Sequence, residues 1–319
     1  MKLIQIFIPL TILVVGCQGK PQTDRDVFSL GDDFHEISAH AEQKKTAPDM
    51  DMLLRVKLPP KPTRSEVINY INIIFTLSRN QRSYLDSDPQ VGMLTKVGRQ
   101  NIDLILQASR PGVSWVKYGI EAISQMVGEE DRNLILENLR TNYGLARVVF
   151  AKGWCAQAES ILSNMVAASS GYLPSEAVKC LASLQKPELY PILINYMTGG
   201  WNSHVTYGNI KNLPGIELTE ALQKAWESSR GNNYQIGYLT RDTLATGYMP
   251  AFHFLFETID DNYRVPNTIY NAEALIKQFT NQRGEKADLK AWYAANKENI
   301  VFDEALNKYT VAKAVAHTR

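Results

Sequence analysis

The string HEISAH, from His35 to His40, is the part of this chain that comes nearest to a metal-dependent active site. Zinc hydrolases use H-E-x-x-H, in which two histidines four residues apart share one helix face and the glutamate is the base. Here the second histidine comes one residue later, so the two rings would lie roughly 140° apart around a helix. No third ligand follows. We therefore expect two solvated histidines, no bound metal and no cofactor.

Other patterns that carry chemistry are weak or absent. The string DSDPQVG, from Asp86 to Gly92, has the start of a calcium loop but lacks its third acidic position and closing glutamate. Pro89 suits the first turn of a helix instead. The sequence holds no G-x-S-x-G elbow, no Walker loop and no G-x-G-x-x-G after a strand. We therefore expect no catalytic residues.

The stretch GGWNSHVTYGN, from Gly199 to Asn209, is the best candidate for a binding surface. It interrupts the regular helical pattern, and aromatic residues grouped with Asn and Arg are typical of binding surfaces. The alternative is that Trp201 and Tyr207 simply pack the junction between two repeats. The candidate partner-binding residues are Trp201, Asn202, His204, Tyr207, Asn209, Tyr238 and Arg241.

The binding surface indicates a non-catalytic scaffold, and an enzyme acting on envelope glycans is the alternative interpretation. Helical hairpins can close into an α/α toroid, and such chemistry needs two carboxylates beside a sugar bond or a tyrosine–histidine pair. Each available residue is also explained as a cap or a solvated helix face, so we prefer a non-catalytic scaffold. An open curve would favour the scaffold and a closed ring the enzyme. The residues available to the enzyme are Asp242, Asp260, Asp261, Glu273, Tyr207, His204 and His253.

The first residues of the chain predict export. Lys2 is followed by an apolar run over 3–13 and then by VVGC, which ends at Cys17. A basic start, an apolar stretch of this length and small residues after it are typical of a secretory signal. The run is too short for the roughly 20 residues of a membrane-spanning helix.

VVGC resembles the lipobox of bacterial lipoproteins, in which the signal is cut before a cysteine that carries a diacylglycerol. The resemblance implies a mature protein that begins at Cys17 and is held on a membrane of the cell envelope by lipid. Gln18, rather than Asp, after this cysteine favours the outer membrane if the cell is Gram-negative. The alternative is an ordinary secretory signal whose cleavage site happens to contain a cysteine.

Composition indicates a globular body on a tether. The chain has 319 residues, 45% hydrophobic and 21% charged, which is typical of folded domains. Its net charge of +1 argues against nucleic acid as a partner. A polar stretch that ends LPPKPT reads as a spacer. We expect a signal peptide over 1–16, the lipidated cysteine and tether over 17–62, helical repeats over 63–285, and a C-terminal helix and tail over 286–319.

The sequence of the body predicts a series of consecutive helices. Apolar residues recur at i, i+3, i+4, i+7 and i+8, for example in the stripe from Ala158 to Val166, and no stretch alternates convincingly with a period of two. We therefore expect an all-α fold, an α-solenoid of about six or seven antiparallel helix pairs. The expected pairs are 64–80 with 89–107, 112–127 with 130–140, 143–152 with 155–168, 174–185 with 187–198, 202–212 with 217–229, 233–246 with 249–259, and 267–280 with 287–299.

The segment from Ser169 to Met197 resembles a HEAT-type repeat, with EAVKCLASL on one helix, a KPEL turn and PILINYM on the next. The segment 141–168 is equally similar to a tetratricopeptide repeat. The stretch from Leu289 to Tyr309 resembles a C-terminal extension of bacterial envelope repeat proteins, with a Trp helix, an FD turn and a terminal KY. The resemblance implies a curved scaffold for contact with an envelope protein or peptide, and it implies no catalytic residues.

Two cysteines remain in the body, Cys155 and Cys180. If the helices on either side of Ser169 to Leu173 form a tight hairpin, the two cysteines are offset by about 10 Å along the helix axes. Disulfide Cα atoms lie within about 7 Å of each other. We therefore expect two buried free thiols.

Overall fold

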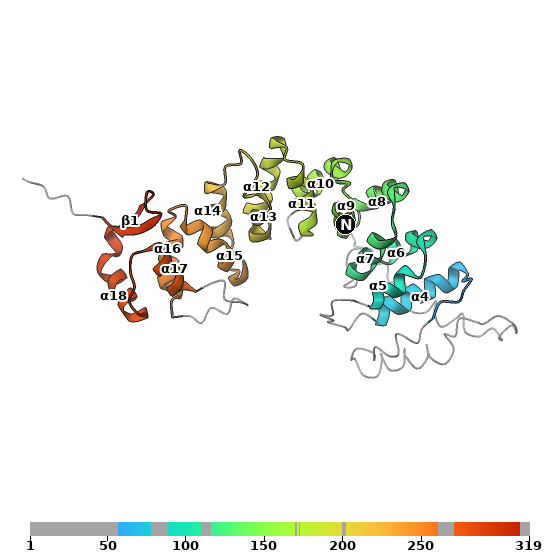
Figure 1. Cartoon of the computed structure of the whole chain (residues 1–319), viewed down its shortest axis with the longest axis horizontal. Helices are drawn as coiled ribbons and strands as arrows, with labels where there is room; N and C mark the ends of the chain where they lie inside the picture. The colour runs from blue at the N-terminus through green and yellow to red at the C-terminus, as the bar shows by residue number, and fades with distance from the viewer. Residues whose placement is uncertain are drawn as a thin grey trace, which may run out of the picture. The chain divides into compact units, whose positions relative to one another are not determined.

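The computed structural model contains fifteen α-helices among the residues it describes, α4 to α18, and a single β-hairpin (Figure 1). The predicted all-α fold is confirmed. No helix in this described part is long and apolar enough to cross a membrane. Cys17, the HEISAH string, Trp201 and Asp261 lie outside the described residues. The structure describes residues 57–77, 89–109, 116–169, 171, 173–199, 202–260 and 271–312.

The chain divides into two compact units, Met1–Lys152 and Gly153–Arg319. In the first unit α7 packs against α5, α6 and α9. Its helices are α4 (Arg64–Leu77), α5 (Pro89–Thr95), α6 (Ile102–Ala108), α7 (Val116–Met126), α8 (Arg132–Leu139) and α9 (Ala146–Ala151), with short 3₁₀ turns at Arg99–Asn101, Glu129–Asp131 and Tyr143–Leu145.

Local signals explain where the first helices begin and end. Thr63 and Glu66 form the reciprocal bonds of a capping box before α4. Pro89 is the first residue of α5, as its position predicts. The expected single helix over 89–107 is wrong, because α5 and α6 are separated around Gly98, whose φ of 83° lies outside the helical region.

The second unit stacks helical hairpins in two rows. The hairpins are α10 with α11, α12 with α13, α14 with α15, and α16 with α17, and each packs against the next. Helices α10, α12 and α14 are neighbours in one row, and α11, α13 and α15 in the other, which fits an α-solenoid. The bounds are α10 (Cys155–Ala168), α11 (Ser175–Ser183), α12 (Tyr190–Thr198), α13 (Ser203–Ile210), α14 (Thr219–Ser228), α15 (Asn233–Leu244), α16 (Met249–Thr258), α17 (Ala272–Phe279) and α18 (Lys286–Asn296), with 3₁₀ turns at Pro187–Leu189 and Lys297–Asn299.

The most extensive pairings are shifted by one helix from the expected ones. The sequence pairs 174–185 with 187–198, whereas α11 packs more extensively against α10 than against α12. The same shift recurs for α13 and α15. An apolar stripe shows which face of a helix is buried, but in an array each helix has a neighbour on either side, so periodicity alone does not choose between them.

A β-hairpin follows the last helix, where we expect none. Strands β1 (Ile300–Asp303) and β2 (Lys308–Val311) pair antiparallel, with Phe302 opposite Tyr309. The ring of Tyr309 stacks on Phe252 of α16 at 4.1 Å. Its hydroxyl donates to the carbonyl oxygens of Leu244 (3.1 Å) and Tyr248 (3.3 Å). The FD of the expected turn therefore ends a strand, and the hairpin covers the connection between α15 and α16.

The expected pair of free thiols is wrong, because Cys155 and Cys180 form a disulfide with a Cα–Cα distance of 5.0 Å. The expectation assumed a tight turn after α10. Instead the connection from Ser169 to Pro174 is extended at both ends, and α11 begins only at Ser175. This length of chain lets α11 return beside the first turn of α10, so the 10 Å offset disappears. The bond joins the two helices of the first hairpin of this unit.

Candidate functional site

Three aromatic side chains meet on the row formed by α11, α13 and α15. His204 lies in the first turn of α13, and Tyr234 and Tyr238 lie one turn apart on α15, which packs against α13. The spacing of four residues places both tyrosines on one face of α15. Asn232 caps the start of this helix, where its side chain accepts a hydrogen bond from the backbone N–H of Gln235. We call His204, Tyr234 and Tyr238 the aromatic cluster.

The rings of the aromatic cluster are in mutual contact. His204 stacks on Tyr238 with centroids 4.8 Å apart and meets Tyr234 edge-on at 5.2 Å. The two tyrosine rings are 4.9 Å apart, and the Tyr238 hydroxyl lies 3.4 Å from that of Tyr234, to which it donates. Tyr234 nevertheless remains 45% exposed. The cluster is therefore a braced surface feature and not part of the core.

The surroundings of His204 and Tyr238 favour their uncharged forms. Burial lowers the pKa of His204 below its ordinary value, an effect that the Gln235 side chain partly opposes. The Nδ1 atom of His204 is buried and has no hydrogen-bond partner among the described residues. The hydrogen bond from Tyr238 to Tyr234 raises the pKa of Tyr238. The cluster therefore offers a neutral imidazole, tyrosine ring faces and hydroxyl groups to a ligand.

A second group lies farther along the same two helices. Lys211 pairs with Asp242 at 3.3 Å, and its Nζ lies 5.3 Å from the centre of the Tyr207 ring. Burial, together with the nearby Asp242 carboxylate, raises the pKa of Tyr207 to about 12. Arg241 is exposed on the same helix as Asp242. Polar and charged groups therefore border the aromatic cluster on one side.

The remaining predicted site residues hold the backbone in place. Asn202 donates through Nδ2 to the carbonyl oxygen of Leu173 (3.2 Å), and Asn209 donates to that of Val205 (2.7 Å). The structure therefore brings His204 and Tyr238 together, whereas the side chains of both asparagines are used in hydrogen bonds to the backbone. Tyr234 is not among the binding residues predicted from the sequence, although its spacing of four residues from Tyr238 indicates that the two share a helix face.

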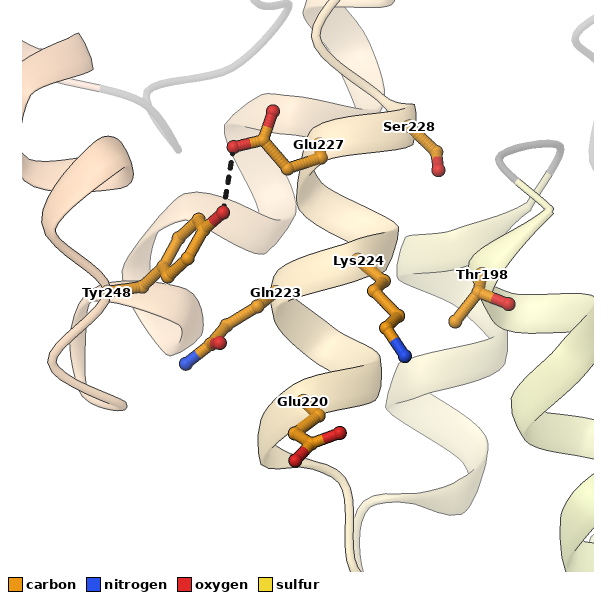
Figure 2. Close-up of a pocket in the computed structure, with 7 residues that line it drawn as sticks. All are labelled: Thr198, Glu220, Gln223, Lys224, Glu227, Ser228 and Tyr248. Carbon is orange, nitrogen blue, oxygen red and sulfur yellow. Dashed lines mark hydrogen bonds between the residues drawn. The ribbon is translucent and has the colours of Figure 1, made fainter.

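The other row of helices carries two adjoining hollows beside α14, and Figure 2 shows the residues that line the smaller of them. One, of about 720 Å³, lies between α12 and α14, and the other, of about 680 Å³, lies between α14 and Tyr248 at the start of α16. Thr198, Glu220 and Lys224 border both. The Tyr248 hydroxyl donates to Glu227 at 2.9 Å, which closes one side of the smaller hollow.

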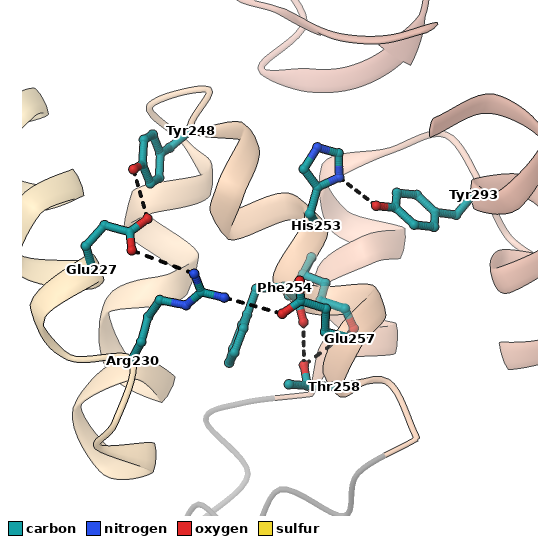
Figure 3. A network of polar contacts seen from close by, with 9 residues as sticks. Glu227, Arg230, Tyr248, His253, Phe254, Glu257, Thr258 and Tyr293 are labelled. Carbon is teal, nitrogen blue, oxygen red and sulfur yellow. Dashed lines mark hydrogen bonds and ion pairs between the residues drawn. The ribbon is translucent and has the colours of Figure 1, made fainter. Parts of the chain in front are cut away.

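The residues available to an enzyme lie in separate polar contacts. Asp242 pairs with Lys211, Asp260 with Lys286 and Lys290, and Glu273 with Lys277. The ring of His253 shares a hydrogen bond with the Tyr293 hydroxyl at 2.7 Å, beside the network that joins Glu227, Arg230 and Glu257 (Figure 3). In the described part of the chain, no group of three or more His, Cys, Asp or Glu residues is placed to hold a metal ion.

Comparison with known proteins adds no relative. No family model, no curated protein and no solved structure matches this chain. Only the residues of this chain and their geometry therefore indicate a function.

Proposed function

We propose that this chain is an exported bacterial lipoprotein, anchored in the cell envelope through Cys17, whose HEAT-like helical body binds an envelope protein or peptide without catalysing a reaction. The lipobox-like VVGC supports the anchor. In a Gram-negative cell, Gln18 favours the outer membrane. The aromatic cluster is the single observation that carries the binding function.

Aromatic residues on an open helix face favour recognition. Large rings contribute much of the binding energy of interfaces, and Tyr is enriched among the residues whose truncation weakens binding most. The three rings hold one another at 4.8 to 5.2 Å, so they lose little conformational freedom when a partner binds. The ion pair of Lys211 with Asp242 lies beside them, as in the polar rim of an interface.

The geometry also narrows what the cluster can contact. A cage for a cation needs ring faces that surround an empty space, whereas these rings fill the space between them. The available surface is the exposed part of Tyr234, together with the exposed hydroxyl groups of Tyr234 and Tyr238. Such a surface fits an apolar or aromatic side chain of a peptide flanked by backbone groups that accept hydrogen bonds. A standard interface buries about 800 Å² per partner, so the cluster would be its centre and not its whole extent.

Crosslinking in native cells tests this proposal. We expect the wild-type chain to crosslink one abundant envelope protein through its second unit, and Tyr234→Ala/Tyr238→Ala to lose that product. Tyr143→Ala is the matched control, because Tyr143 is 40% exposed and lies in the first unit. A product that persists in the double variant would contradict the assigned face. Absence of any protein product would contradict the protein scaffold and favour a glycan or small ligand.

A further inference from the structure

The hollow between α12 and α14 presents charged side chains that have no partner in the described part of the chain. Glu217, Glu220 and Lys224 border it, and the side chain of none of them makes an ion pair or hydrogen bond with another described residue. Its apolar part is formed by Pro191 and Ile194 of α12, with Ala221 of α14. We call this hollow the acidic groove.

The absence of a pair between Glu220 and Lys224 is informative. They lie four residues apart on α14, the spacing at which Glu and Lys normally pair on a helix. On α17 the same spacing gives an ion pair, Glu273 with Lys277 at 2.5 Å. Figure 2 draws both side chains, and no hydrogen bond joins Lys224 to Glu220. Both side chains are exposed, so they can pair with a ligand without first breaking a bond within the protein.

Carboxylates outnumber cations around the groove. Among the described residues that line the groove there are two carboxylates, Glu217 and Glu220, and one cation, Lys224, and the lining of the adjoining hollow adds Glu227. Glu227 already accepts a hydrogen bond from Tyr248 and lies 3.8 Å from Arg230, so the surplus resides mainly with the first two carboxylates. A negative lining disfavours phosphates and anionic lipid and favours basic side chains.

We propose that the acidic groove is a second docking site, which binds an extended cationic segment of a partner protein. Basic side chains of the segment pair with Glu217 and Glu220, and an apolar side chain between them packs on Pro191 and Ile194. An extended segment suits this pattern because alternate side chains point to opposite sides. The site lies on α12 and α14, in the row opposite the aromatic cluster, so it does not depend on the function proposed above.

A labelled peptide tests the acidic groove directly. We would measure, by fluorescence anisotropy at low salt, the affinity of the full chain for a fluorescein-labelled octapeptide that alternates Lys and Leu. The counterpart with Glu in place of Lys should not bind. Glu217→Gln/Glu220→Gln should weaken binding of the Lys peptide about tenfold, because two exposed ion pairs are lost. Lys224→Gln should strengthen it about threefold, because a like charge is removed.

Two controls separate this site from other surfaces. Glu298→Gln removes a carboxylate that is 84% exposed near β1, outside the groove, and should leave the affinity unchanged. Tyr234→Ala/Tyr238→Ala should also leave it unchanged. The proposal is overturned if both peptides bind equally, if the double Gln variant binds like the wild type with an unchanged melting temperature, or if the Tyr variant abolishes binding.

Discussion

Loss of the Cys155–Cys180 bond should lower the free energy of unfolding of the second unit by about 3.5 kcal/mol. The bond closes a loop between cysteines 25 positions apart, and this loop length sets the chain entropy that the bond removes from the unfolded state. For a unit of this size, such a loss corresponds to a fall in melting temperature of about 10 °C. Cys180 is fully buried and Cys155 nearly so, which places the bond inside the packed hairpin.

Reduction is the cleanest perturbation, because it breaks the bond and removes no carbon or sulfur atom from the core. The chain would be unfolded, reduced and refolded with and without reductant, and its melting followed by circular dichroism at 222 nm. Cys155→Ser/Cys180→Ser is the matched variant. Its melting temperature should be close to that of the reduced protein and should not change when reductant is added. Titration of thiols in denaturant should find none from these two cysteines before reduction and two after it.

Two results would refute this reasoning. If both thiols titrate in the untreated protein, the bond does not form and the axial offset expected from the sequence is correct after all. If the bond forms but reduction leaves the melting temperature unchanged, the loop is already restricted in the unfolded state and the entropy argument fails.

Three further changes have expected outcomes. Gly247→Ala should lower the free energy of unfolding by about 1–3 kcal/mol, measured in urea, because φ is 77° and a Cβ would lie 2.5 Å from the Phe302 ring. His204→Gln should reduce the loss of folding stability between about pH 7 and 5. Burial lowers the pKa of His204 in the folded protein below the 6.5 of the unfolded chain, so protonation favours the unfolded chain. The contribution of His204 to stability is therefore present above about pH 6.5 and is lost as the pH falls. Equal slopes in the two proteins would contradict this. Cys17→Ala should abolish labelling by radioactive palmitate, and any retained label would exclude the proposed anchor.

The helices were predictable because each buries one apolar stripe against its neighbours. The helix expected over 155–168, which carries the stripe from Ala158 to Val166, is confirmed as α10, and Pro89 marks the start of α5. The break at Gly98 was not predicted, because apolar residues continue on both sides of it. A periodic pattern shows which face is buried, whereas the break depends on one residue with positive φ.

The β-hairpin and the disulfide were not predicted either, but the reason is different. Each depends on contacts between parts of the chain that are distant in sequence. Tyr309 is buried because it stacks on Phe252, and the sequence of β2 alone does not indicate this contact. The two cysteines meet because the connection after α10 is extended, which apolar spacing does not report. Local propensity is a weak guide where tertiary contacts decide.

The candidate site was predictable in part. The unusual composition of 199–209 drew attention to His204, and the structure places that residue against Tyr238, as a shared surface requires. Neither asparagine could be separated from the binding residues by type, because Asn serves equally in binding surfaces and in bonds to the backbone. Only the contacts show that Asn202 and Asn209 hold carbonyl oxygens in place.

The hairpin of α14 and α15 carries parts of both proposed sites on its two helices, and the core between them explains how this is possible. Trp226 of α14 is fully buried, and its Nε1 donates to the hydroxyl of Thr240 on α15 at 2.9 Å. Its ring also meets Phe254 of α16 edge-on at 5.4 Å. A closely packed core of this kind holds α14 and α15 at a fixed separation, because displacing a large buried ring creates a cavity. The α14 side of the acidic groove and the α15 side of the aromatic cluster therefore belong to one rigid hairpin, and we expect binding at either proposed site to leave the other in place.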